Sequence, residues 1–188
     1  MARINRLGFA AFVAALIATP LVAQSFSDGY TFLKAVRERD GATAERIIAN
    51  PSSTAINARD PSSGETALHI LVRGRDINWL AFMLSRGARP DSQSNDGTTP
   101  LILSVQLGWT EGAAQLLARH ANPNLGNRSG ETPLIIAVHR RDIQMVRLLI
   151  SQNANPNQTD NLAGNSAIDY ARQDPRAAMI LQELTRRH

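Results

Sequence analysis

The sequence of 188 residues contains no cysteine. That absence excludes disulfide bonds, zinc sites with cysteine ligands and a lipid-modified cysteine at the N-terminus. The four histidines are scattered and form no His-Glu-x-x-His pattern, so the usual zinc spacings are missing. The chain also lacks a Gly-x-Ser-x-Gly elbow and a phosphate-binding glycine loop. We therefore predict no catalytic residue, no metal site and no cofactor, and we expect a protein that is not an enzyme.

Lysine is nearly absent as well, since Lys34 is the only lysine beside 19 arginines. The formal net charge is +4, and it falls to +2 without Arg3 and Arg6, which lie in a segment that we expect to be removed. The sequence shows no basic stripe with interleaved aromatic residues, which argues against a nucleic-acid partner. Arginine still matters for recognition, because its planar guanidinium binds a carboxylate through two parallel hydrogen bonds.

The N-terminal segment 1–25 predicts a Sec-type signal peptide that is cleaved. Met1–Arg6 carries two arginines and no acidic residue, and Leu7–Ala18 is an almost unbroken apolar run. This run is shorter than the ~20 residues that cross a bilayer comfortably. Small residues then offer cleavage positions after Ala23 or after Ser25. The segment has no paired arginines, which disfavours twin-arginine export.

A short pattern recurs further along the chain at a fixed spacing. The copies begin at Gly64, Gly97 and Gly130 and read Gly-Glu-Thr-Ala-Leu-His, Gly-Thr-Thr-Pro-Leu-Ile and Gly-Glu-Thr-Pro-Leu-Ile. A weaker fourth copy, Gly-Asn-Ser-Ala-Ile-Asp, begins at Gly164, one position later than the same spacing would place it. The period of 33 residues between the first three copies predicts stacked supersecondary units instead of one globular core.

Each copy of the pattern predicts the start of a helix. The glycine permits a tight turn, and the Thr or Ser hydroxyl can accept a hydrogen bond from the first backbone N–H groups of the helix. Pro100 and Pro133 fall at the first helical position, where a backbone N–H is not needed. The apolar residue that comes next should point inward in every copy: Leu68, Leu101, Leu134 and Ile168.

A second apolar run follows each copy at a constant offset, with spacings of three and four positions that place its members on one helical face. These second helices should end at Gly87, His120 and Asn153, which repeat at the spacing of the pattern, each in the left-handed conformation. Glycine suits that conformation well and asparagine tolerates it. His120 carries more strain there, so we expect its helix end to be the least ideal.

The order of turn, Thr-Pro-Leu helix, short loop, apolar helix and polar loop resembles the ankyrin repeat over about residues 27–188. The resemblance implies an all-α solenoid of stacked helix-turn-helix units with projecting hairpin loops. It divides the domain at residues 26–188 into an N-terminal capping unit, three full repeats and a C-terminal capping repeat, at 26–60, 61–93, 94–126, 127–160 and 161–188. The motif histidine remains only at His69, because Ile102, Ile135 and Asp169 replace it, so the hydrogen-bond ladder between repeats should be incomplete.

The resemblance also bears on localisation. Ankyrin proteins of animal cells work mostly inside the cell, so an exported and cysteine-free chain fits a bacterial periplasm best, with secretion as the alternative. About 160 residues remain after cleavage, and a chain of that size buries a sufficient core without disulfides. We expect a monomer with no membrane anchor once the signal peptide is removed.

The resemblance implies a protein–protein interaction module that binds another protein on a concave face made of loop tips and first helices. The repeat register places twelve candidate partner-binding residues on that face: Arg73, Asn95, Asp96, Thr98, Gln106, Leu107, Trp109, Arg128, Ser129, Glu131, His139 and Arg140. An exported effector that binds a host protein is the alternative. An unrecognised enzyme or sugar-binding protein is a third and weaker hypothesis.

The two tryptophans occupy different places in the repeat. Trp79 corresponds to Gly112 and Met145, which predicts a core position. Trp109 corresponds to Asp76 and Asp142, which predicts a solvent-exposed site. An exposed tryptophan there would anchor a partner, or it would cover the end of its own repeat.

Overall fold

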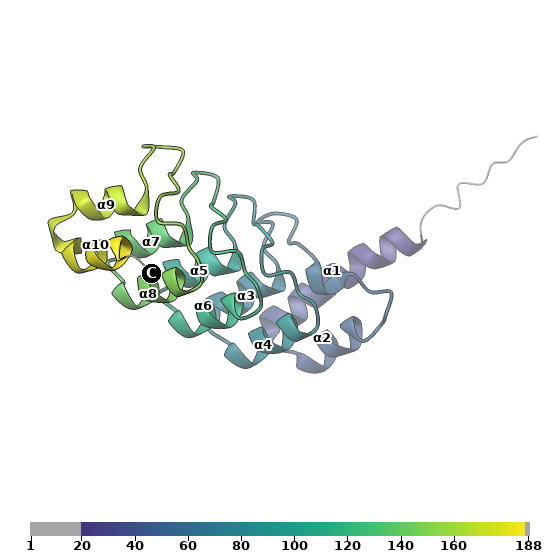
Figure 1. The fold of residues 1–188 in the computed structure, drawn as a ribbon. Coiled ribbons are helices and arrows are strands. Elements are labelled where there is room, and N and C mark those ends of the chain that lie inside the picture. The colour runs from purple at the N-terminus through teal and green to yellow at the C-terminus, as the bar shows by residue number, and fades with distance from the viewer. Residues whose placement is uncertain (1–19, 187–188) are drawn as a thin grey trace, which may run out of the picture.

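The structure is a computed structural model, and it describes residues 20–186, with side chains from residue 28 onward. Five antiparallel helix pairs stack in this part of the chain (Figure 1). The first helices form one row: α1 (Pro20–Glu38), α3 (Ala67–Arg73), α5 (Pro100–Gln106), α7 (Pro133–His139) and α9 (Ala167–Gln173). The second helices form the row below it: α2 (Gly41–Ile48), α4 (Ile77–Ser85), α6 (Thr110–Leu117), α8 (Ile143–Ser151) and α10 (Ala178–Thr185). Short 3₁₀ turns lie at Ala55–Asn57 and Pro175–Ala177.

The predicted helix starts are confirmed. Thr99 Oγ1 accepts from the Ile102 N–H at 3.1 Å, and Thr132 Oγ1 accepts from the Ile135 N–H at 3.3 Å. Both helices have proline in their first turn. The capping hydroxyls are buried together with the helix starts, where they satisfy backbone N–H groups that water does not reach. The cap therefore fixes the start of the first helix in each of these repeats.

The predicted helix ends are also confirmed. Gly87, His120 and Asn153 have φ values of 92°, 63° and 63° and close α4, α6 and α8. A second left-handed position, which the sequence reasoning missed, lies in the turn between the two helices of a pair. Arginine occupies that position in three units, as Arg39, Arg75 and Arg141 with φ between 51° and 59°, and Gly108 occupies it between α5 and α6.

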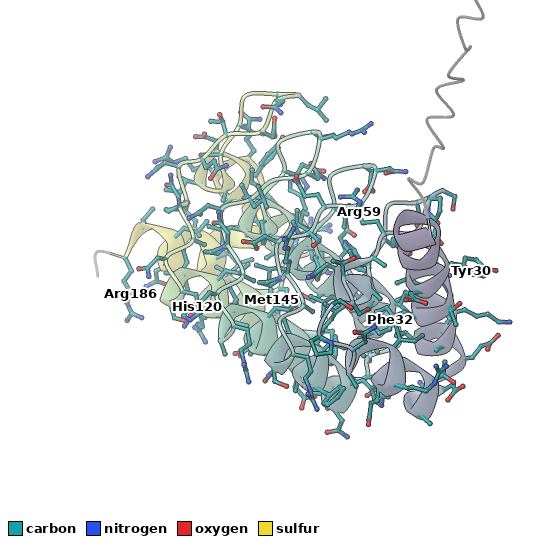
Figure 2. All side chains as sticks on the ribbon, turned by 90° about the vertical axis from the view of Figure 1, so that its right-hand side faces the viewer. Tyr30, Phe32, Arg59, His120, Met145 and Arg186 are labelled. Carbon is teal, nitrogen blue, oxygen red and sulfur yellow. The ribbon has the colours of Figure 1, made fainter. Side chains whose placement is uncertain are left out.

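The core runs without interruption along the stack. Leu68, Leu101 and Leu134 are at most 1% exposed, and each first helix packs against the next first helix. At the N-terminal end, Phe32 points into the stack whereas Tyr30 projects outward and is 64% exposed (Figure 2). The repeats therefore share one apolar layer, as expected of units that cannot bury their own apolar faces alone.

Four hairpin loops project from the first-helix row, and backbone hydrogen bonds link their tips (Figure 1). They lie at 60–65, 94–98, 127–131 and 160–165. The N–H of Asn95 donates to Ser63 O at 2.8 Å, that of Arg128 to Asp96 O at 3.1 Å, and that of Asn161 to Ser129 O at 2.8 Å. These bonds fix each loop relative to its neighbour.

The side-chain ladder near the helix starts is incomplete, as the sequence predicts. His69 Nδ1 accepts from the Thr66 N–H at 3.1 Å, so Nε2 carries the proton that it donates to Thr98 O at 2.9 Å. Burial lowers the pKa of His69. Isoleucine at the next two equivalent positions makes no such bond, which leaves one histidine link between the first and second full repeats.

Most of the predicted signal peptide, residues 1–19, lies outside the described residues. The described part of α1 includes both predicted cleavage positions, Ala23 and Ser25. Among the described helices, none combines the length and the apolar character needed to cross a membrane.

Candidate protein-binding face

The hairpin loops and the exposed ends of α3, α5 and α7 form one surface, which we call the loop face. A hollow of about 390 Å³ lies on it between the first two hairpins, with Leu103 in its wall. Five of the predicted partner-binding residues line this hollow: Arg73, Asn95, Asp96, Thr98 and Gln106. The structure thus brings together residues that the repeat register placed on one face.

Two of the residues around this hollow form an ion pair. Arg73 Nη2 binds Glu65 Oε1, which ties the end of α3 to the first hairpin. The arginine side chain is 58% exposed, so solvent weakens the pair. A partner can compete for this guanidinium more easily than for a buried one. Gln106, at the end of α5, is exposed and makes no hydrogen bond through its side chain within the described part of the chain.

The loop residues at the second hairpin serve the loop itself. Asp96 accepts from Ser94 Oγ at 2.5 Å, from the Thr98 N–H at 3.1 Å and from Thr98 Oγ1 at 3.0 Å. These bonds, led by that from Ser94, lower the pKa of Asp96. Asn95 Nδ2 donates to Ser62 O of the preceding hairpin at 2.8 Å. Thr98 is only 8% exposed, so these three side chains shape the hollow more than they offer free groups to a partner.

The third hairpin is built in the same way. Asn127 Oδ1 accepts from the N–H groups of Ser129 and Glu131, both at 3.0 Å, and Asn127 Nδ2 donates to Glu131 Oε2 at 3.0 Å. Arg128 lies at the tip of this hairpin and is exposed. Its guanidinium has no hydrogen-bond or ion-pair partner among the residues that the structure describes.

The turns between paired helices carry the remaining candidates. Arg75 Nη2 donates to Leu107 O at 2.7 Å, and the Arg140 guanidinium lies against Gly108, 2.9 Å from where a Cβ atom would stand. The two arginines therefore flank the half-buried turn of Leu107 in the second full repeat. Arg75 is a residue that the sequence reasoning missed, although its arginine counterparts at the same repeat position could have indicated a shared role.

His139 contacts the last repeat. Its ring meets the ring of Tyr170 edge-on, with centroids 4.3 Å apart. Tyr170 Oη donates to Asp160 Oδ2 at 2.5 Å, and this bond is the main cause that raises the pKa of Tyr170. The sequence reasoning did not select Tyr170. Its repeat register offered a signal, because a tyrosine with its hydroxyl stands where the preceding repeats have the aliphatic Leu103 and Ile136.

The prediction that Trp109 is exposed is wrong. Its side chain is 7% exposed and folds back over its own helix, where Cδ2 lies 2.5 Å from the Cβ position that Gly112 leaves empty. Asp76 and Asp142 cap the equivalent helices through bonds to the N–H groups three positions later, whereas Trp109 makes no such bond. Trp109 thus covers the end of its own repeat, and we remove it from the candidate partner-binding residues.

Trp79 also departs in part from its prediction. It packs against the core but remains half-buried, because it lies at the surface between α4 and α2. Its Cζ2 atom is 2.8 Å from the position that a Cβ on Gly41 would take, and its ring meets Phe82 edge-on at 5.9 Å. This tryptophan joins the N-terminal unit to the first full repeat.

The loop face shows no arrangement typical of catalysis. In the part of the chain that the structure describes, no three His, Asp or Glu side chains are grouped to hold a metal ion. The acidic residues with lowered pKa values act as helix caps and loop acceptors, as Asp40, Asp160 and Asp174 do. Their hydrogen bonds explain these shifts without a reacting group.

Comparison with known proteins identifies the family. A family model described as ankyrin repeats (3 copies) matches residues 32–125, 71–160 and 104–182. These matches cover more than half of the chain, which therefore belongs to the ankyrin repeat family, and the predicted all-α repeat solenoid is confirmed. Ankyrin repeats are generally protein–protein interaction modules, and the family is typically non-enzymatic.

Several curated proteins share part of this sequence. The chain is 33% identical over 75 residues to the oxysterol-binding protein homolog 1 of Saccharomyces cerevisiae, a region that is 38% of this chain. Over 60 residues, 31% of this chain, it is 40% identical to the nuclear factor NF-kappa-B p105 subunit of Gallus gallus and 42% identical to that of Mus musculus. It covers 6% of the length of each of these relatives.

Proposed function

We propose that this protein is an exported interaction module that acts in the periplasm and binds a polypeptide partner on the loop face. The observation that carries the proposal is the hollow of about 390 Å³ between the first two hairpins, at which five of the predicted residues meet. The hairpins around it are tied to one another by backbone hydrogen bonds. A surface fixed in this way loses little conformational entropy when a partner binds.

The differences between the repeats also support this proposal. Residues that hold the fold, such as the capping threonines and the inward leucines, recur from copy to copy. The exposed ends of the first helices differ, with Arg73, Gln106 and His139 at equivalent positions. Varied side chains on a repeated scaffold can select one partner among many, because the scaffold does not constrain them.

Site-specific photo-crosslinking tests the proposed face. A benzophenone amino acid would replace Gln106 on α5, and a matched variant would carry it at Gln144, an exposed glutamine on α8. We expect a discrete adduct with a polypeptide in growing cells for the Gln106 variant and none for the Gln144 variant. Equal adducts from both positions, or an adduct at Gln144 alone, would contradict the proposed face.

The proposed destination has a separate test. If the signal peptide is cleaved, the intact mass of the exported protein should correspond to a chain that begins at Gln24 or at Phe26. The protein should appear in the osmotic-shock fraction. Retention of Met1 would refute cleavage, and recovery of the protein in the medium would favour the alternative of an exported effector.

A further inference from the structure

Nearly all acidic side chains on the loop face already bind other groups of the protein. Asp60 accepts from Ser62 Oγ at 2.6 Å and from Arg37 Nη2 at 2.5 Å. Asp96 and Asp160 accept hydrogen bonds within their own hairpins, and Glu131 accepts one from Asn127 within the third hairpin. These carboxylates therefore hold the loops. Asp60 is also paired with an arginine, whereas Asp96, Asp160 and Glu131 accept from uncharged donors and keep their negative charge.

The acidic residues without any such bond lie elsewhere. Among the residues that the structure describes, only Glu45 and Glu111 have neither a hydrogen bond nor an ion pair through their side chains. They belong to α2 and α6, in the row of second helices. The carboxylates that bind no other group of the described chain thus lie in the row of second helices.

Two arginines at the hairpins have no acidic partner in the described part of the chain, one directly before the first hairpin and one on the third. Arg59 and Arg128 are exposed, and neither guanidinium has an acidic partner within the described range 28–186. Figure 2 shows Arg59 beside the projecting loops. Its Nη2 atom lies 2.7 Å from the position that a Cβ on Gly64 would occupy, so the guanidinium rests against the first hairpin. Arg128 stands on the third hairpin, which its own backbone N–H ties to Asp96 O of the second.

Both arginines line a second hollow of about 390 Å³, which we call the hairpin hollow; its other lining residues are Gln93, Ser94, Gly97 and Asn127. The donors of these neutral residues are already used. Gln93 Nε2 donates to Gly97 O at 3.1 Å and to Gly126 O at 3.0 Å, and Ser94 Oγ donates to Asp96 Oδ1 at 2.5 Å. The guanidinium N–H groups are therefore the strong donors left at this hollow.

The chemistry of the lining selects the kind of ligand. Guanidinium groups pair best with planar or tetrahedral anions, and a carboxylate accepts two parallel N–H bonds from one arginine. No aromatic residue of the described chain lines the hairpin hollow, so it offers no surface on which a base could stack. These features favour carboxylates of a polypeptide over a nucleic acid.

We propose that the hairpin hollow binds an acidic segment of the partner polypeptide, with Arg59 and Arg128 each holding a carboxylate side chain. The segment lies across the second hairpin, between the two arginines that border it. This inference rests on the proposed function, because it assigns a chemical class to one part of the partner. Such a contact adds orientation and a faster encounter with the partner, as charge pairs at the rim of an interface do.

Fluorescence anisotropy with a labelled peptide of alternating glutamate and serine tests the inference on the full protein. We expect saturable binding that weakens as salt is added, because exposed charges are screened. The Arg59→Gln/Arg128→Gln variant should bind about three- to tenfold more weakly. The matched control, Arg46→Gln/Arg119→Gln, removes two exposed arginines associated with second helices and should leave the affinity unchanged.

Three results would overturn the inference. They are equal loss of affinity in the control variant, equal binding of a peptide with glutamine in place of glutamate, and tighter binding of a single-stranded oligonucleotide that depends on the same two arginines. Circular dichroism and urea midpoints of both variants should match the unaltered protein. If peptide binding fails while the crosslink from Gln106 persists, only the acidic-segment inference is refuted and the proposed function stands.

Discussion

Substitution of Gly112 by alanine tests the contact between the Trp109 ring and α6. A Cβ at this position would lie 2.5 Å from Trp109 Cδ2 and closer still to Cε3 and Cζ3, far inside van der Waals contact. The close atoms belong to a rigid ring that is 7% exposed, so a small side-chain adjustment cannot relieve the clash. The indole has to leave its place over α6.

The sign of the effect depends on whether the tryptophan is present. Alanine in a helix interior is favoured over glycine by about 1 kcal/mol. Displacing half of the ~150–250 Å² that a tryptophan buries costs about 2 to 3 kcal/mol at ~25 cal/mol per Å². We therefore expect Gly112→Ala to lower the free energy of unfolding by about 1 to 2 kcal/mol, since the lost burial exceeds the gain in helix propensity.

The same substitution should stabilise a Trp109→Asp background. There the ring is gone, and the new aspartate can cap the helix as Asp76 and Asp142 do through bonds of 3.1 and 3.0 Å. Gly112→Ala should then raise the free energy of unfolding by about 1 kcal/mol. The two backgrounds would differ by about 2 to 3 kcal/mol, which is a coupling free energy between the two sites.

Urea unfolding followed by circular dichroism measures all four members of this cycle, with midpoints and slopes fitted together. Tryptophan emission gives an independent signal, because a displaced Trp109 should move its emission to longer wavelength in Gly112→Ala. Stabilisation by Gly112→Ala in both backgrounds would refute the reasoning, since it would mean that the ring does not occupy this space.

Three further predictions concern stability. Leu134→Ala should cost about 2 to 5 kcal/mol in urea unfolding, because Leu134 is fully buried; an unchanged midpoint would show that it lies outside the core. His120→Gly should stabilise the protein by up to about 1 kcal/mol by relieving a φ of 63°, and a loss of stability would show that the imidazole makes a needed contact. Because burial lowers the folded-state pKa of His69, the unfolded state protonates first as the pH falls through about 6.5, and stability should then decrease. His69→Ile should flatten the stability curve in this range, and an unaltered slope would assign the effect to another group.

The helix starts and ends could be predicted from the sequence because they depend on local chemistry. A threonine hydroxyl caps the N–H three positions away, and a left-handed residue closes a helix whatever lies beyond it. Trp109 could not be placed by comparing its position with Asp76 and Asp142 alone. Gly112 offered a further signal. In the preceding repeat the positions equivalent to Trp109 and Gly112 hold Asp76 and Trp79, so the large ring has moved from the second of these positions to the first.

The binding candidates were harder to predict than the fold. The register correctly gathered Arg73, Asn95 and Gln106 around one hollow. It could not show that Asn95 already donates to the preceding hairpin, since that bond joins residues of different repeats. It also offered no reason to select Arg59, which precedes the first copy of the pattern.

Short-range patterns in the chain were enough to establish the repeat period, the helix pairs with their caps, and the resemblance to the family, because each depends on neighbouring positions within a repeat. Which polar side chains remain available to a partner depends instead on the tertiary structure. A carboxylate such as Asp60 is neutralised by Arg37 from the neighbouring helix, at 2.5 Å, whereas Arg59 beside it finds no acid in the described part of the chain. Pairing of this kind depends on distances between repeats that no local pattern encodes.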